Sequence, residues 1–188
     1  MSRASTDVAE PLAPPSLAGE TRFITSDIFR RPAFGRNHPL SIARQSGVLD
    51  LCEALGWLEP HNELTCKPAS PESLTRFHDP AYVEALKGAS ARGLATVEDR
   101  DRYAFGTMEN PLFEGVFERA AATVDGAIRS AEVALAGGTA FHPAGGTHHG
   151  RRDRACGFCY FNDPVFAIQT LLEGGAARVM YIDLDAHH

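Results

Sequence analysis

The sequence predicts an α/β fold in which helices cover both faces of a parallel sheet, giving three layers. Residues 178–184 form an apolar run without polar alternation, which is typical of a strand buried on both faces. A predicted helix that ends at Gly174 and Gly175 comes just before this run. Helix, glycine turn and buried strand in succession are characteristic of α/β proteins. The length of 188 residues is consistent with one domain.

The N-terminal part of the chain is predicted to hold a tail, a strand and a helix. Residues 1–20 are rich in Pro, Ala and Ser and lack periodicity, so we expect a disordered tail ahead of a single domain over 21–188. A first short strand is expected within 22–28, followed by a loop over 29–46. Apolar residues at helical spacing then predict a short amphipathic helix over 48–55.

The next helices are marked by a capping residue followed by proline. Ser70-Pro71 and Asp79-Pro80 both have this pattern, and 89–107 is predicted to be a loop.

The longest helix carries a continuous apolar stripe over 113–135, which we interpret as core packing. A short strand is expected at 140–141. Asn162 and Pro164 mark the start of the last helix, which precedes the apolar run.

The net charge and the lack of long apolar runs argue against some classes of function. The net charge of -6 argues against nucleic acid as a direct partner, because phosphate binding requires a basic surface. No run reaches the roughly 18 apolar residues of a membrane span, and no secretory signal is visible. A cytoplasmic location is therefore the default expectation.

The spacing of Cys156 and Cys159 allows a redox pair or half of a zinc site. Cys52 and Cys66 are a poor match for a second pair of zinc ligands. We therefore favour small, partly buried thiols.

Asp183, Asp185 and His187 alternate at the carboxyl end of the predicted last strand. In an extended backbone these side chains leave on one side and converge. Ligands of doubly wound sheets bind at this end of the strands. Carboxylate oxygen and imidazole nitrogen suit a divalent ion such as Zn²⁺, although an acidic strand end can instead cap a neighbouring helix.

His148 and His149 are adjacent in a glycine-rich loop. They suit three roles: metal ligands, a general acid/base pair, or rings that pack the loop. A carboxylate beside one ring would fix its tautomer and raise its basicity, and Asp183 is the candidate.

Three segments resemble the zinc-dependent histone deacetylase superfamily, in that family's order and spacing. The resemblance is closest to its bacterial branch of acetoin-utilisation proteins and acetylpolyamine amidohydrolases. The segments are 145–149 (GGTHH), 157–163 (GFCYFND) and 181–188 (YIDLDAHH). The resemblance implies an arginase/deacetylase-like fold. It also implies zinc-dependent hydrolysis of acetyl-lysine, or a related acetylated amine, to acetate and free amine.

The resemblance also implies a role for each matching residue. Asp185 and His187 match two zinc ligands. His148 and His149 match the tandem histidines that activate water and protonate the leaving amine, and Asp183 matches the carboxylate behind His148. With Asp185 and His187, Asp183 also matches a site for a monovalent cation such as K⁺.

Four further residues match substrate-binding positions of the family. Phe158 matches a wall of the acyl-lysine tunnel, and Gly157 offers its carbonyl beside the substrate. Arg44 matches the arginine of the inner channel where acetate leaves. Glu109 falls near the rim position that holds the substrate backbone.

The chain departs from the family pattern at its end. Three matches are missing: the aspartate behind His149, the third zinc ligand and the late tyrosine that polarises the carbonyl. We therefore expect a truncated sequence, the N-terminal part of one deacetylase domain, that is inactive alone. Two alternatives stay open: an arginase-like dimanganese hydrolase, and a non-catalytic protein that binds an acetylated ligand.

Overall fold

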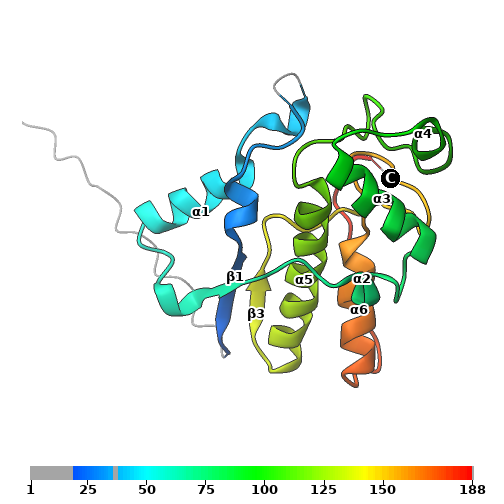
Figure 1. Cartoon of the computed structure of the whole chain (residues 1–188). Coiled ribbons are helices and arrows are strands. Elements are labelled where there is room, and N and C mark those ends of the chain that lie inside the picture. The colour runs from blue at the N-terminus through cyan, green and yellow to red at the C-terminus, as the bar shows by residue number, and fades with distance from the viewer. Residues whose placement is uncertain (1–18, 36–37, 188) are drawn as a thin grey trace, which may run out of the picture.

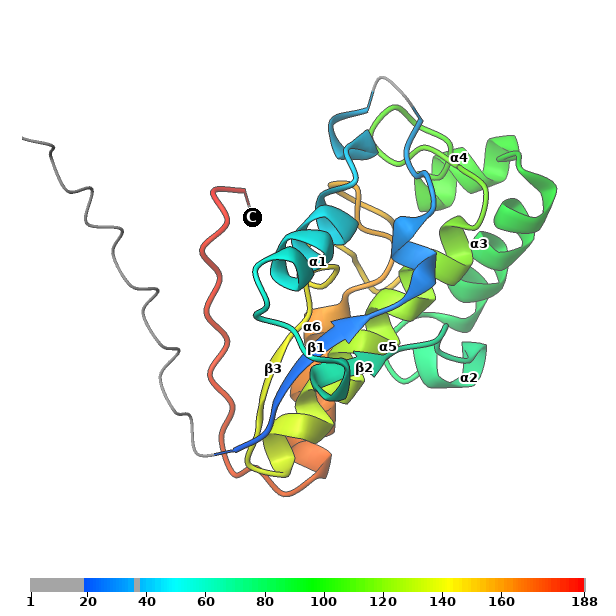
Figure 2. The same ribbon diagram turned by 90° about the vertical axis from the view of Figure 1, so that its left-hand side faces the viewer.

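The computed structural model describes residues 19–35 and 38–187, and it contains a parallel sheet flanked by helices. Figure 1 shows strands β1 and β3 between helix α1 on one side and helices α5 and α6 on the other. The view in Figure 2, with α1 in front of the sheet, agrees with this order. The predicted three-layer α/β fold is confirmed. The expected tail lies, over residues 1–18, outside the described part of the chain.

Strands and helices do not alternate regularly along the described chain. The strands are β1 (Thr21–Thr25), β2 (Glu63–Thr65) and β3 (Thr139–Phe141). The helices are α1 (Arg44–Ala54), α2 (Pro71–Leu74), α3 (Pro80–Arg92), α4 (Val97–Tyr103), α5 (Val116–Leu135) and α6 (Asp163–Glu173). Short 3-10 turns occupy Asp27–Arg30, Pro39–Ser41 and Pro60–Asn62.

Strand β1 is the centre of the sheet, whose order in the described chain is β2-β1-β3. Both neighbours are parallel to it, and Phe23 is opposite both Glu63 of β2 and Phe141 of β3. Ile24 of β1 is fully buried. The strands expected at 22–28 and 140–141 are therefore confirmed, whereas the three-residue strand β2 was not predicted.

The prediction of a buried strand over 178–184 is wrong. This segment pairs with none of the described strands, and Ile182 and Leu184 are 68% and 93% exposed. In Figure 2 the segment, drawn in red, stands apart from the sheet. An apolar pattern shows that a segment is suited to burial, but a strand also needs a hydrogen-bonded neighbour, which the pattern does not specify.

The predicted helix caps are confirmed. The Ser70 side chain accepts from the amide of Ser73, and the Asp79 side chain accepts from the amide of Ala81 at 2.8 Å. Asn162 caps α6 in the same way. Each cap satisfies an amide at the start of a helix that has no partner within the helix.

The prediction of a loop over 89–107 is wrong, because α3 continues to Arg92 and α4 follows. Thr96 and Asp99 form a reciprocal capping box at the start of α4. The helix was missed because its sequence is mostly charged and gives no apolar periodicity.

The helix predicted over 48–55 is present, but α1 already begins at Arg44, inside the expected loop over 29–46, and its buried face differs from the predicted one. Leu51 and Leu55, which were expected to face the core, are 57% and 50% exposed. Leu49 is the buried residue of this helix in the structure. Helical spacing alone does not determine which side of a helix its neighbours cover.

The main core lies between α3, α4, α5 and α6 and is rich in aromatic rings. Tyr82, Phe105, Phe161 and Phe166 are fully or almost fully buried in it. His78 packs among the same rings and is 1% exposed. No helix in the described residues is both long and apolar enough to span a bilayer.

Candidate active site

A cavity of about 1030 Å³ brings together most of the residues selected from the sequence. Its lining includes both tandem histidines and residues from α1, the turn before α5, and the segment after α6. The predicted residues in this lining are Arg44, Glu109, His148, His149, Gly157, Phe158, Asp185 and His187. Asp183 is not in the lining but contacts His148 from behind.

The tandem histidines are carried by the loop that follows β3. The His148 side chain is only 13% exposed, and the centroids of the two imidazole rings are 4.1 Å apart. Glycines at 145 and 146 precede the pair, and Gly146 has φ of +86°, a conformation that residues with a side chain rarely adopt. The turn therefore requires glycine to direct both rings to the cavity.

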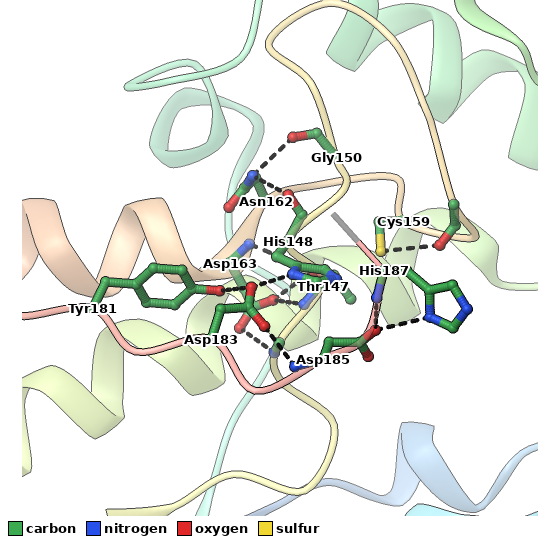
Figure 3. A network of polar contacts seen from close by, with 12 residues as sticks. Thr147, His148, Gly150, Cys159, Asn162, Asp163, Tyr181, Asp183, Asp185 and His187 are labelled. Carbon is green, nitrogen blue, oxygen red and sulfur yellow. Dashed lines mark hydrogen bonds and ion pairs between the residues drawn. The ribbon is translucent and has the colours of Figure 1, made fainter.

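Asp183 makes the hydrogen bond expected of it, accepting from Nδ1 of His148 (Figure 3). Its carboxylate also accepts from the amide of Asp185 at 3.0 Å and from the hydroxyl of Tyr181 at 2.8 Å. These donors, the Asp185 amide first, lower the pKa of Asp183 to about 2. The carboxylate therefore stays charged and favours the tautomer of His148 that leaves Nε2 free to accept a proton.

Asp185 and His187 contact each other instead of converging with Asp183 on one point. Nδ1 of His187 lies 2.9 Å from Oδ1 of Asp185, and their side chains are 84% and 51% exposed. Among residues 19–35 and 38–187, no group of three or more His, Cys, Asp or Glu is arranged to hold a metal ion. A carboxylate oxygen and an imidazole nitrogen are donor types that suit zinc, and a catalytic zinc site normally has three protein ligands.

A tight hairpin between Cys156 and Cys159 forms another wall of the cavity. Its two tip residues, Gly157 and Phe158, have φ of +54° and +68°. The Gly157 amide donates to Oε1 of Glu109 at 2.8 Å, and the Phe158 amide donates to Oδ1 of Asn110 at 3.1 Å. Glu109 therefore holds the hairpin tip in this unusual conformation.

Gly157 also packs against His149. A Cβ atom at position 157 would lie 2.5 Å from Cδ2 of the His149 ring, which is closer than two carbons can approach. The hairpin thus fixes one side of the second histidine. The rings of Phe158 and His38 pack in a T-shaped arrangement, with centroids 4.6 Å apart.

All four cysteines are free thiols. Burial raises the pKa of Cys66 to about 12 and that of Cys159 to about 11, which makes both poor nucleophiles. The interpretation of small buried thiols therefore fits these two residues.

Several residues of the cavity were not selected from the sequence, including Arg119 and Thr123 of α5, His142 and Thr147. Arg119 and Thr123 were interpreted only as parts of the long helix, and His142 as part of a loop. Thr147 lies within the segment 145–149 but was given no role of its own.

The fold and this cavity define an α/β protein with an imidazole–carboxylate pair at a candidate hydrolytic site. The histone deacetylase domain model matches residues 38–188. The acetoin utilization protein AcuC of Bacillus subtilis (strain 168) is 37% identical over 169 residues, which are 88% of this chain and 43% of that protein. Histone deacetylase 8 of Xenopus tropicalis is 37% identical over 147 residues, which are 77% of this chain and 39% of that protein.

The chain is also similar to solved structures of histone deacetylase homologs. A crystal structure of an HDAC homolog complexed with SAHA is similar to this chain with a TM-score of 0.84 and 34% sequence identity. The match covers 90% of this chain and 45% of that one. A crystal structure of an HDAC homolog from Aquifex aeolicus has a TM-score of 0.83 at the same identity.

The chain belongs to the histone deacetylase family. It spans less than half the length of each of these relatives.

Proposed function

We propose that the protein is a zinc-dependent deacetylase that hydrolyses acetyl-lysine, or a related acetylated amine, to acetate and free amine. The observation that carries the proposal is the hydrogen bond from His148 to Asp183 at the edge of a large cavity. Membership of the histone deacetylase family supports the same chemistry.

His148 is the proposed general base. Its Nδ1 donates to a carboxylate that stays charged, so Nε2 is available to take a proton from water. The Asp183 carboxylate also stabilises the positive charge that the ring then carries. His149, held against the hairpin, is proposed to protonate the leaving amine.

Asp185 and His187 are the proposed metal ligands of this part of the chain. A third ligand is proposed to be an aspartate from outside residues 19–187. When bound, zinc acts as a Lewis acid toward the acyl carbonyl and lowers the pKa of water at the site. A monovalent cation such as K⁺ beside Asp183 is part of the same proposal.

The remaining cavity residues are proposed to bind the substrate and release acetate. Phe158 would flank the acyl-lysine chain, and the carbonyl of Gly157 would accept from it. Arg44 would bind the departing acetate. For Glu109 we propose two roles. It would hold the substrate backbone at the rim of the cavity, and it supports the hairpin tip, because one carboxylate oxygen already accepts from the Gly157 amide.

The test is hydrolysis of acetyl-lysine peptides and acetylpolyamines by the complete gene product and by two variants. His148→Ala should lower kcat by about 10² to 10⁴, the usual contribution of a general base. His61→Ala is the matched control, because His61 is 70% exposed and does not line the cavity. Equal activity of the two variants would refute the role of His148. Tight binding of these ligands without turnover would favour a non-catalytic protein.

A further inference from the structure

The loop over 143–150 carries both proposed catalytic histidines, yet it contains no helix or strand. Strand β3 ends at Phe141, and the next regular element is α6. A loop without a backbone ladder needs other contacts to hold a side chain in one place. In this structure several of them come from the two residues at the start of α6, Asn162 and Asp163.

Asp163 holds the part of the loop that precedes His148. Its carboxylate accepts from the amide of Gly146 at 3.0 Å and from the amide of Thr147 at 2.6 Å. The Thr147 hydroxyl lies within hydrogen-bond distance of both this carboxylate and the carbonyl of Phe161, the two acceptors for its single proton. Asp163 is only 3% exposed, so these donors replace the water it lost on burial.

Asn162 holds His148 itself and the residue that follows the pair. Its Nδ2 donates to the carbonyls of His148 and Gly150, each at 2.9 Å (Figure 3). Its Oδ1 accepts from the amide of Val165, so the same side chain also caps α6. Both ends of the amide group are therefore used.

The start of α6 is itself held in place by the core. The Asn162 amide donates to Nε2 of His78 at 3.1 Å, and Nδ1 of His78 donates to the carbonyl of Arg152 at 3.1 Å. Phe166, one turn into the helix, is fully buried. The loop is thus bound to a rigid element.

We propose that Asn162 and Asp163 are positioning residues that keep His148 opposite Asp183. This inference rests on the proposed function, because it gives His148 a role in the reaction. The hydrogen bonds hold the loop before His148, at its own carbonyl and after His149, so the ring has little freedom to shift. A displacement of about 1 Å at a reacting group can lower a rate about 10²-fold.

Two variants test the proposal. In Asp163→Asn, an NH₂ group replaces one of the oxygens that accept from Gly146 and Thr147. Asn162→Asp keeps an oxygen to cap α6 but removes both donated hydrogen bonds. Asp99→Asn is the matched control, because Asp99 is also a buried carboxylate at a helix start, accepting from the Thr96 amide at 2.9 Å without contact to the loop.

Two readouts are measured in the complete gene product: kcat and KM on an acetyl-lysine peptide, and amide hydrogen exchange over 146–150. We expect Asp163→Asn to lower kcat about 10²-fold with KM changed less than about threefold. Asn162→Asp should lower kcat about 10-fold. Amide exchange over 146–150 should become at least about 10-fold faster in both variants and stay unchanged in Asp99→Asn.

The outcomes separate this inference from the proposed function. If the wild type is active and all three variants lose activity only in proportion to their unfolded fraction, the positioning role is wrong. If the wild type hydrolyses no acetylated amine, the proposed function fails, and amide hydrogen exchange over 146–150 is the measurement that still tests the positioning role. Faster exchange over 146–150 in both α6 variants then supports the positioning role, and unchanged exchange overturns it.

Discussion

His78 is buried where a positive charge is costly, so acid should destabilise the fold through this residue. It is 1% exposed and surrounded by aromatic rings, including that of Phe161. Burial lowers its pKa from 6.5 to about 4, against the smaller opposing effect of the Arg152 carbonyl. Protonation of Nε2 would also remove the acceptor for the Asn162 amide.

The sign and size of the effect follow from these two pKa values. The unfolded chain, with a pKa near 6.5, takes up the proton before the folded chain does as the pH falls. The contribution of His78 to the free energy of unfolding is therefore constant above about pH 6.5, declines between about pH 6.5 and 4, and is constant again below pH 4. At about 1.36 kcal/mol for each pKa unit, the loss is about 3 kcal/mol, a large part of a typical domain stability of about 5–15 kcal/mol.

Urea unfolding at pH 7 and pH 4 measures this loss. His78→Asn keeps a neutral hydrogen-bonding side chain and removes the titration. The stability difference between wild type and His78→Asn should shrink by about 3 kcal/mol on going from pH 7 to pH 4. His61→Asn, a change at an exposed histidine, should follow the wild type. Equal losses in wild type and His78→Asn would refute the reasoning.

Two further predictions concern the hairpin and the thiols. Gly157→Ala should cost about 1–3 kcal/mol in thermal unfolding, because the new Cβ meets the His149 ring at a positive φ. Gly93→Ala, also at positive φ but with open space around it, should cost only about 1 kcal/mol, and an equal cost would exclude the contact as the cause. With a thiol reagent at pH 8, Cys66 and Cys159 should react only on unfolding, because burial raises both pKa values. Four equal reaction rates in the folded protein would contradict this.

The helices with clear caps could be predicted from the sequence. Asp79 and Asn162 are followed directly by a helix in the structure, because a cap acts on amides within the next three residues. Such information is local, and a sequence contains it in full. Helix α4 had the same kind of evidence in its capping box, but its charged residues hid it from a search for apolar periodicity.

Features that depend on distant parts of the chain could not be predicted in this way. The apolar run over 178–184 is suited to burial, yet the structure leaves it exposed and unpaired with the described strands. Likewise, α1 presents Leu49 to its neighbours and leaves Leu51 exposed. In both cases the outcome depends on which other elements lie alongside.

In the candidate site, too, some features could be predicted from the residue types, and others depend on tertiary contacts. The hydrogen bond between His148 and Asp183 was expected from the residue types, although 35 positions separate them. Asn162 was recognised as a helix cap and Asp163 only as part of the segment 157–163, and neither was given a role toward the histidines. Their hydrogen bonds to the loop depend on a tertiary contact across about fifteen residues, which capping rules do not describe.

The most direct test of the central claim is acetate release from an acetyl-lysine peptide by the complete gene product, before and after removal of metal. We predict that a chelator abolishes turnover, that added Zn²⁺ restores it, and that a hydroxamate blocks the restored activity. Turnover that survives complete metal removal would contradict the proposal, as would restoration by Mn²⁺ but not by Zn²⁺.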